Sequence, residues 1–566
     1  MNVTRDRRIS IAKIVFLLVA LAVYIKLIFT GFSADEEYSL VLAYRIAKGD
    51  RLFGEVWDTI QTSGLLPALL LKPFVFLTNG TTGSMVYLRV CGLIIQILVS
   101  LYLYSVLKKH IGCNKAFFVT VIFAVSFVKM MAMPDFSNQQ TWSLTLLYCF
   151  VWEAFENEEN QKKCFVYMIL SGIAYSCSVL ATADIILFPV ILVFILVLAK
   201  KNKGKYVLTF TGTCFFLGAL FILCVSSKVG LRNMLANAGN VLSGDSTHLQ
   251  GMNLLGKSKV LSNAKDLLTL TIWILASIAV SLGISCLRKK KEERVVKQAL
   301  VIASWIGAGY SLVEWLIVGA GYDTMKLYIP IMTLIGVFLF VKNRSQKVFL
   351  FQLFGTCLGF FSFVNVMLIS NVTIYNNIAF LFPAVISGAV ALCLDDTEER
   401  FIWSYPTVVV YALVTLVGTG FTFLSGNAGN NVFSISGIVK NGPVAGLLTT
   451  KDIAYVYYND YNAFSSLVDD GEKVLIVTDF FKNMSVTSCY MLDNVEISHY
   501  SVNSTPTYSD KLLEYWELFP EKEPNVVMVN TTSVALNEND WIYDYIRKNF
   551  SEENTVTTDI AKYYFR

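Results

Sequence analysis

Residues 10–38 read SIAKIVFLLVALAVYIKLIFTGFSADEEY, an apolar run that ends directly in a cluster of three acids. The run is long enough to cross a bilayer as one helix, and three arginines precede it. No small-residue cleavage site follows, so we expect a first transmembrane helix and not a removed signal peptide. Asp35, Glu36 and Glu37 then lie at the membrane boundary, where carboxylates are costly unless hydrated, paired or used.

Long apolar runs recur along the chain, which is 55% hydrophobic and only 16% charged. A typical soluble protein has about 25% charged residues, so a soluble globular or disordered class is excluded. We predict an α-helical polytopic membrane protein with about 13 transmembrane helices, at about 20 apolar residues each. The predicted spans are 10–32, 85–107, 116–133, 142–155, 165–182, 185–199, 206–227, 268–287, 299–319, 327–341, 348–370, 378–394 and 402–425.

Basic residues mark one side of this predicted membrane domain. With the N-terminus in the cytoplasm, the connecting segments on that side hold 22 Lys and Arg in 54 residues. The loops on the other side hold 10 in 119. Because Lys and Arg concentrate in cytoplasmic loops, the bias predicts a plasma-membrane protein with its N-terminus inside. An odd number of spans then places the C-terminal segment outside the cell.

Two domains are predicted from the change in composition. Residues 1–425 form the membrane domain, and residues 426–566 form a small extracytoplasmic α/β domain with 10 basic and 19 acidic residues. An acidic soluble part argues against nucleic acid as a partner. Apolar segments bounded by turn residues predict its strands, and amphipathic segments predict its helices. The strands are expected at 473–478, 494–501 and 525–530, and the helices at 511–518 and 541–550.

The first outer loop, residues 33–84, belongs to the predicted membrane domain but has an unusual pattern. Residues 38–47 and 65–76 are amphipathic and predict two helices that lie on the membrane surface. One interpretation is a lid that only packs over the bundle. The other is a site at the membrane–water boundary, which would suit a lipid-linked substrate.

Acids follow three of the predicted spans on the same outer side. Asp35 comes after span one, Asp135 after span three and Asp184 after span five. Paired acids deprotonate an acceptor or hold a metal ion. We favour such a function for Asp35 and Asp135, and we favour a solvated helix end for Asp184. A divalent metal and a bare carboxylate base both stay open, and the metal ligands are unknown.

Basic residues accompany these acids near the outer boundary. They are Arg45, Lys72, Arg89 and Lys326. A charge at the edge of a span needs an anionic partner, and a lipid phosphate or pyrophosphate would supply one. The alternatives are snorkelling of the side chain to the interface and pairing with the nearby acids. A further lysine, Lys129, fits snorkelling better.

Residues 251–258 read GMNLLGKS and fit the P-loop pattern in full. A working P-loop follows a strand and precedes a helix, which aims its backbone amides at phosphate. The residues before this segment are polar and do not predict a strand, and the segment falls on the outer side, where ATP is scarce. We therefore expect a loop without nucleotide-binding function.

Four segments together resemble the first outer loop and second helix of the GT-C glycosyltransferases. They are Phe32–Tyr38, Ala43–Gly49, Trp57–Gly64 and the pair Leu88-Arg89. The pattern is most similar to the family 39-like branch, which includes protein O-mannosyltransferases and lipid A aminoarabinose transferase. Two departures are Thr62-Ser63 in place of a proline pair, and Lys326 where the family often has His.

This resemblance implies a fold, an activity and a set of site residues. Such enzymes transfer a sugar from a polyprenyl-phosphate donor to an acceptor on the outer face, usually with inversion at the sugar carbon. The acceptor here would be an envelope polysaccharide, teichoic acid, lipid or protein. The implied roles are Asp35 as the base, Glu36 as its support, Asp135 as a second acidic site, and Arg45, Lys72 and Arg89 as phosphate ligands.

Two other classes of function remain as alternatives. A transporter or flippase for a lipid-linked saccharide predicts charges near the middle of the membrane and internally repeated halves. The sequence has neither an evident repeat nor that charge distribution. A non-catalytic envelope scaffold or sensor predicts that Asp35 is dispensable and that the acidic tail binds the partner.

Overall fold

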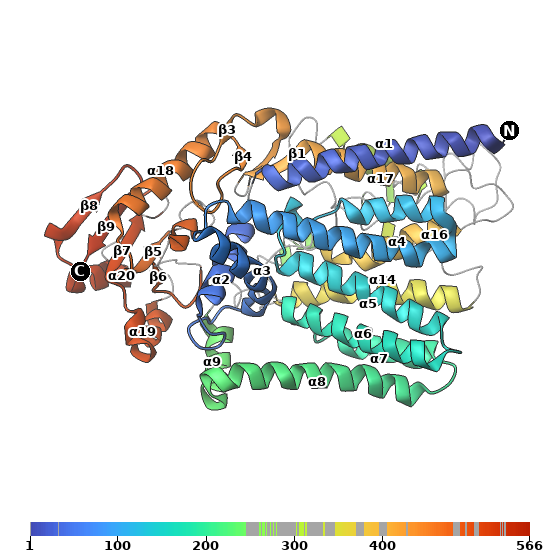
Figure 1. The fold of residues 1–566 in the computed structure, drawn as a ribbon, viewed down its shortest axis with the longest axis horizontal. Coiled ribbons are helices and arrows are strands. Elements are labelled where there is room, and N and C mark those ends of the chain that lie inside the picture. Colours follow the sequence, from blue (N-terminus) through green and yellow to red (C-terminus); the bar gives the residue numbers. More distant parts are fainter. Residues whose placement is uncertain are drawn as a thin grey trace.

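The computed structural model describes residues 2–31, 33–244, 346–369, 378–394, 404–425 and 428–478, most of 487–566, and isolated residues between 260 and 333. In this part of the chain, a bundle of long helices carries a mixed α/β domain at one end (Figure 1). The N-terminus lies at the far end of the bundle, and the C-terminus lies in the α/β domain. The predicted fold class is confirmed.

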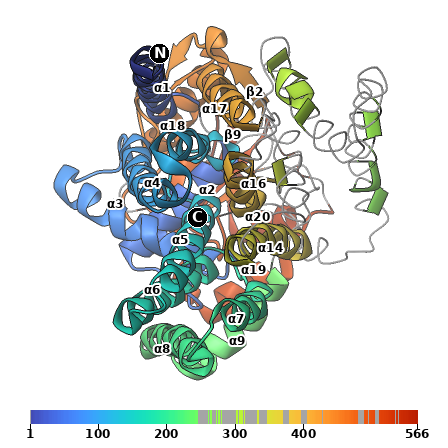
Figure 2. The same cartoon turned by 90° about the vertical axis from the view of Figure 1, so that its right-hand side faces the viewer.

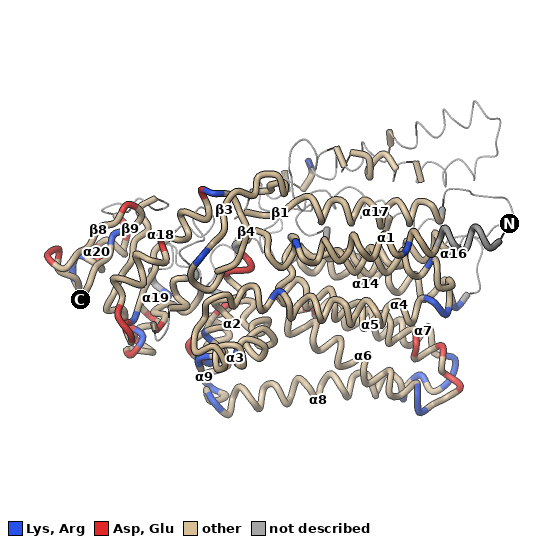
Figure 3. Tube along the Cα trace, turned by 45° about the horizontal axis from the view of Figure 1, so that its top comes forward, with Lys and Arg blue, Asp and Glu red and all other residues tan. Residues whose placement is uncertain are grey.

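The surface of the bundle is suited to lipid. Five described helices are long and apolar enough to cross a bilayer, and three shorter helices are also apolar. Large apolar side chains face outward from α1 (Asn2–Phe29) and α8 (Lys203–Val229), such as Leu18 at 62% and Phe215 at 71% exposure. Charged residues gather at the two ends of the bundle and are sparse along its middle (Figure 3). The chain is therefore a multi-pass membrane protein.

Most described helices coincide with predicted spans. Figure 2 looks along their axes and shows them side by side, with α8 next to α6 and α7. The predicted spans 268–287, 299–319 and 327–341 lie largely outside the described residues. The other bundle helices are α4 (Ser84–Ala124), α5 (Phe136–Glu156), α6 (Gln161–Ala181), α7 (Leu187–Leu198), α14 (Gln346–Ile369), α16 (Phe382–Leu394) and α17 (Ser404–Phe421).

Helix α4 consists of two helices joined at Gly112, whose φ of 78° and ψ of 159° are not helical. Its second half runs beside α1. Lys13, early in α1, donates to the side chain of Asn114, and Tyr24, farther along α1, donates to the carbonyl oxygen of Ala124. These two contacts fix the direction of the second half, so α4 supplies the predicted spans two and three.

The predicted third span, 116–133, is wrong in its second half. The helix ends at Ala124, and irregular backbone with one 3-10 turn continues to residue 135. Backbone groups freed inside a membrane domain need internal partners. Gln96 supplies one, because its Nε2 donates to the carbonyl oxygen of Phe123 at 2.6 Å. The irregular segment packs directly against α4 at Gly92, because a Cβ at this position would lie 1.9 Å from the carbonyl oxygen of Ala132.

The first outer loop forms α2 (Ala34–Lys48), the 3-10 turn η1 (Gln61–Gly64) and α3 (Leu65–Thr78). Both predicted helices are present. Helix α3 exposes Phe76 and Leu77 at 84% and 80%, as expected for a helix on a membrane surface. The prediction that α2 also lies on that surface is wrong. Its residues 40–44 are at most 2% exposed, because side chains of both the bundle and the α/β domain pack around them.

The α/β domain is built on a five-stranded sheet of order β6-β5-β7-β9-β8. Strands β6, β5 and β7 are parallel and fall within the three predicted strand segments, whereas β9 and β8 are antiparallel and were not predicted. All five residues of β7 are buried, as in the centre of a sheet covered on both faces. The strands are β5 (Lys473–Val477), β6 (Glu496–Ile497), β7 (Val526–Asn530), β8 (Thr555–Thr557) and β9 (Ala561–Phe565).

Three helices accompany this sheet. They are α18 (Lys451–Leu467), α19 (Ser509–Leu518) and α20 (Trp541–Asn549), and the sequence predicted the last two. A hairpin of β1 (Thr422–Ser425) and β2 (Ala428–Asn431) follows α17, so the predicted boundary between residues 425 and 426 falls within this hairpin. A second short pair joins β3 (Gly437–Ile438) to β4 (Leu448–Thr449).

Candidate active site

Three acids open helix α2, where the bundle meets the α/β domain. Ser33 is the N-cap, and its hydroxyl oxygen accepts a hydrogen bond from the backbone N–H of Glu36. The positive end of the helix dipole favours negative charge at this turn. Glu36 and Glu37 are 1% and 0% exposed, whereas Asp35 is partly exposed. Asp35 is therefore the acid of this turn that a ligand reaches most easily.

Glu36 forms a two-armed ion pair with Arg89 of α4. The guanidinium Nε and Nη2 lie 2.8 and 2.6 Å from the two carboxylate oxygens, and both side chains are at most 2% exposed. The same guanidinium closes the C-terminal end of α1 by donating to backbone carbonyls. These belong to Leu27, Ile28 and Thr30, each at 3.2 Å, and to Gly31 at 2.7 Å. Arg89 of α4 thus uses its five N–H donors in hydrogen bonds to α2 and to the end of α1, and these bonds hold the three helices together.

Asp135 is the N-cap of α5, and its Oδ1 accepts from the backbone N–H of Asn138 at 2.9 Å. The side chain is 1% exposed. The irregular segment before Asp135 is held in turn by the Asn138 amide, which donates to the carbonyl oxygen of Met131 at 2.7 Å. The sulfur of Met131 accepts from the hydroxyl of Ser33, the cap of α2, at 2.6 Å. The segments that carry Asp35 and Asp135 therefore touch at the start of α2.

The turn η1 also packs onto the membrane helices near this point. Gln139, in the first turn of α5, donates to the carbonyl oxygen of Ser63 at 2.7 Å. The hydroxyl of Thr62 donates to the carbonyl oxygen of Leu180, at the end of α6, at 2.6 Å. The two residues that depart from the family pattern thus join the outer loop to α5 and α6.

Asp184 lies in the short loop between α6 and α7, and it is 0% exposed. The preferred interpretation of this residue as a solvated helix end is therefore wrong. Its Oδ1 accepts from Gln140 at 2.7 Å and from Asn365 at 3.2 Å. Burial raises the pKa of Asp184 to about 7, and hydrogen bonds, led by that from Gln140, oppose this increase. The loop is thus locked to α5 and α14 by a buried polar cluster.

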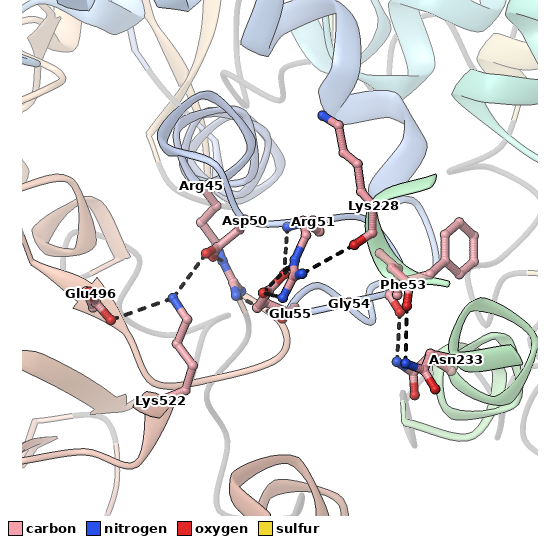
Figure 4. A network of polar contacts seen from close by, with 12 residues as sticks. Arg45, Asp50, Arg51, Phe53, Gly54, Glu55, Lys228, Asn233, Glu496 and Lys522 are labelled. Atoms are coloured by element: carbon pink, nitrogen blue, oxygen red, sulfur yellow. Dashed lines mark hydrogen bonds and ion pairs between the residues drawn. The ribbon is translucent and has the colours of Figure 1, made fainter. Parts of the chain in front are cut away.

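Arg45 lies at the other end of α2 from Asp35, about 15 Å away at about 1.5 Å per residue. Its buried guanidinium pairs with Asp50 at 2.8 Å, and Asp50 also pairs with Lys522 of the α/β domain at 3.0 Å (Figure 4). Burial alone would raise the pKa of Asp50, but the charges of Arg45 and Lys522 outweigh it and hold the pKa below its ordinary value. This network fastens the outer loop to the α/β domain.

The other two predicted phosphate ligands have different positions. Lys72 is exposed on α3, the helix whose apolar face is also exposed. Lys326 lies outside the described residues, as does the segment 251–258. Of the residues predicted for the site, the structure brings Glu36 and Arg89 into direct contact, and it separates Arg45 from both.

Sequence reasoning missed a contact from α18 to the acidic turn. The hydroxyl of Tyr457 donates to Glu37 Oε1 at 2.5 Å, although the two residues are 420 positions apart. Burial raises the pKa of Glu37 well above its ordinary value; the Tyr457 hydrogen bond opposes this increase, and the charges of Glu36 and Asp460 add to it. No local pattern pairs residues at such a distance.

A second missed group had a visible signal in the sequence. The run Ser137-Asn138-Gln139-Gln140-Thr141 is polar, although an apolar helix follows it, and all five side chains are buried. Buried amides in a membrane helix need hydrogen-bond partners. The amides of Asn138, Gln139 and Gln140 donate hydrogen bonds to the irregular segment, to η1 and to Asp184. A polar run at the start of an apolar span was therefore the sequence signal for these buried contacts.

The comparison with known proteins gives structural neighbours only. No family model matches this sequence, and no curated protein matches it. The chain is similar to ArnT from Cupriavidus metallidurans bound to undecaprenyl phosphate, with a TM-score of 0.50, 10% identity and 97% of each chain covered. It also matches the Archaeoglobus fulgidus oligosaccharyltransferase in complex with Zn and sulfate, at a TM-score of 0.48 and 11% identity, over 91% of this chain and 68% of that one.

The match to ArnT spans nearly all of both chains, so it includes the helical bundle and the α/β domain. The chain has the GT-C fold. The resemblance predicted from the first outer loop is thereby confirmed at the level of the fold. The acidic turn directly follows α1 in this fold, as the resemblance of the first outer loop implied. Among the described residues, no three His, Cys, Asp or Glu side chains form a cluster suited to a metal ion.

Proposed function

We propose that this protein transfers a sugar from a polyprenyl-phosphate donor to a cell-envelope acceptor at the outer face of the plasma membrane. The observation that carries the proposal is the first turn of α2. There Asp35 is partly exposed, whereas Glu36 and Glu37 are buried. This turn lies at the boundary of a membrane domain with the GT-C fold. The acceptor would be a polysaccharide, a teichoic acid, a lipid or a protein.

In the proposed reaction, Asp35 takes the proton of an acceptor hydroxyl group. The hydroxyl oxygen attacks the anomeric carbon of the donor sugar, and the bond from that carbon to the phosphate oxygen breaks. Polyprenyl phosphate leaves, and the sugar carbon is inverted. A positioned general base contributes about 10²- to 10⁴-fold to such a rate. Asp135 would orient the substrate from the touching segment, or share a divalent metal with Asp35.

The buried arginines suggest a change in the expected phosphate ligands. We propose that Arg89 and Arg45 order the site and do not bind phosphate, because their guanidinium groups are already engaged in buried ion pairs. Lys72 and Lys326 then remain the proposed phosphate ligands. The exposed apolar face of α3 supports this role for Lys72, since a lipid-linked donor in the membrane would approach along that helix.

The test is release of polyprenyl phosphate from a panel of polyprenyl-phosphate sugars by the purified protein, with crude envelope as the acceptor. The Asp35→Asn variant should lose about 10²- to 10⁴-fold in rate. Asp452→Asn is a matched control, because Asp452 is also an acid in the first turn of a helix but is exposed on α18. A parallel arm with EDTA decides between a metal and a bare base.

The alternatives make different predictions in the same assay. A transporter or flippase would move the lipid-linked saccharide without releasing polyprenyl phosphate. A scaffold would release none, and its partner binding would survive Asp35→Asn. Equal rates for the wild-type protein and the Asp35→Asn variant would refute the proposed role of the acidic turn.

A further inference from the structure

The α/β domain reaches directly into the acidic turn of α2. Tyr457 projects from α18, and its hydroxyl lies 2.5 Å from Glu37 Oε1. Both side chains are 0% exposed, so water does not compete for this hydrogen bond. The contact joins the soluble domain to the residue two positions after the proposed base.

The surroundings of Glu37 favour a neutral carboxyl group. Asp460, one turn after Tyr457 on α18, adds a like charge that opposes ionisation, as does Glu36 on α2. Cys489 from η6 (Thr487–Met491) packs in the same buried cluster, and its sulfur contacts the carbonyl oxygen of Asp460 at 3.9 Å. A buried carboxyl oxygen without a donor would be costly, and Tyr457 supplies the donor to Oε1.

Backbone hydrogen bonds anchor residues 442–448, the segment directly before α18, to the bundle. The N–H of Gly31, just before the acidic turn, donates to the carbonyl oxygen of Leu448 at 2.8 Å. The N–H groups of Gly83 and Met85, at the start of α4, donate to the carbonyls of Gly442 and Pro443 at 3.1 and 3.0 Å. These bonds flank both ends of the first outer loop.

Successive side chains of an α-helix point about 100° apart around its axis. Glu36 is held from the bundle by Arg89, and Glu37 is held from the α/β domain by Tyr457. Two such restraints in different directions fix the rotation of this turn about the helix axis. The direction of the neighbouring Asp35 is then fixed as well.

We infer that Tyr457 is a positioning residue for the acidic turn, so that the C-terminal domain completes the glycosyl-transfer site. The inference rests on the proposed function, in which Asp35 is the base. Tyr457 touches neither substrate nor reacting atoms in this account. It acts through Glu37 on the orientation of Asp35.

The experiment compares the full-length wild-type protein with Tyr457→Phe, which removes only the hydroxyl. Tyr455→Phe and Tyr458→Phe are matched controls on the same helix, where these tyrosines are 65% and 40% exposed. Hydrogen–deuterium exchange of the backbone amides of residues 34–40 reports on the turn without any substrate. We expect faster exchange in Tyr457→Phe alone. In the transfer assay we expect kcat to fall about tenfold, the rate factor of about 1.4 kcal/mol, with KM for the donor unchanged.

A second substitution tests whether Tyr457 acts through Glu37. In a Glu37→Leu background, Tyr457→Phe should have no further effect on either exchange or kcat. Glu37→Gln keeps an oxygen that accepts from the hydroxyl, so its exchange should match the wild-type protein. A full additional loss in the Glu37→Leu background would overturn the inference. So would equal exchange in Tyr457→Phe and Tyr455→Phe.

The two proposals fail in different ways. If the wild-type protein transfers no sugar from any donor, the proposed function fails, and the exchange data alone still decide whether Tyr457 orders the turn. If transfer is robust and Tyr457→Phe has normal exchange and normal kcat, the proposed function stands and the positioning role is refuted.

Discussion

Arg89 and Glu36 form a buried, two-armed ion pair that joins the second membrane-crossing helix to the first turn of the outer loop. Its carboxylate member, Glu36, is buried directly after Asp35, which is partly exposed. It also fixes the end of α1, because the same guanidinium binds four carbonyl groups there.

Breaking this pair should destabilise the protein strongly. Arg89→Met leaves Glu36 buried without its cation, and we expect a loss of about 3–5 kcal/mol in the free energy of unfolding. The double variant Arg89→Met with Glu36→Leu should recover much of that loss, because no unpaired charge remains. Thermal melting in detergent measures both. Lys72→Met, at an exposed lysine on α3, should melt like the wild-type protein.

Gly92 should be intolerant of any side chain. A Cβ at this position would lie 1.9 Å from the carbonyl oxygen of Ala132, in the irregular segment that leads to Asp135. We expect Gly92→Ala to displace that segment, to lower the melting temperature and to abolish sugar transfer. Gly218→Ala in α8 is the control, because nothing lies within 4 Å of its Cβ position. A Gly92→Ala variant with normal activity would show that the segment has no role in the site.

Arg45 distinguishes a structural role from phosphate binding. Its partner Asp50 is 15% exposed and keeps its ion pair with Lys522, so Arg45→Met should cost less than the about 3–5 kcal/mol of a fully broken buried pair. In Arg45→Met and in the double variant Arg45→Met with Asp50→Leu, KM for the lipid donor should stay close to the wild-type value. If KM for the lipid donor rises in both variants, whatever their stability, Arg45 binds the donor phosphate after all.

His499 should make the α/β domain sensitive to acid. Burial and, second, the charge of Arg45 lower the pKa of His499 to about 3, although a backbone hydrogen bond with Ser501 opposes them. Its ordinary value is 6.5, so the unfolded chain binds the proton first. The contribution of neutral His499 to the free energy of unfolding is therefore fully present above pH 6.5, and it is lost as the pH falls toward 3. At pH 5 the expected loss is about 2 kcal/mol, at about 1.4 kcal/mol per pH unit.

The measurement is the melting temperature of the wild-type protein and of His499→Asn between pH 4.5 and 8. Asn keeps an acceptor for the backbone N–H of Ser501, which His499 Nδ1 binds at 2.9 Å. The variant should lose less stability on acidification than the wild-type protein does. If the melting temperatures of the two proteins fall equally with pH, protonation of His499 does not cause the loss of stability.

A truncation that removes the α/β domain does not distinguish an enzyme from a scaffold. Deleting residues 430–566 would uncover the buried residues of α2 and remove the Tyr457 hydrogen bond. Loss of activity on truncation is therefore expected for an enzyme as well as for a scaffold. Asp35→Asn, which leaves the domain in place, separates the two.

Apolar runs predicted most of the described helices, because a lipid-facing helix needs little besides length and hydropathy. The prediction failed after Ala124, where an apolar segment is not helical. Hydropathy reports whether residues avoid water and says nothing about which backbone groups have partners. Gln96 and Asn138 supply those partners from other helices, and only the folded chain brings them there.

The amphipathic pattern of α2 shows a related limit. The pattern predicted the helix itself, since it depends on residues within the same segment. It did not predict the burial of α2, because the second covering layer comes from residues more than 400 positions later. Helix α3 has a similar pattern, but its outer face is exposed among the described residues.

By itself, the sequence determined a membrane domain, an α/β tail and a cluster of charges at one membrane boundary, because length, hydropathy and charge are properties of the chain. It did not determine which charges are paired. Only tertiary structure decided that Arg89 holds Glu36, that Tyr457 holds Glu37 and that Asp35 is the more exposed of the three acids. The reason is physical: an ion pair or a buried hydrogen bond depends on a distance of about 3 Å between groups that the sequence leaves far apart.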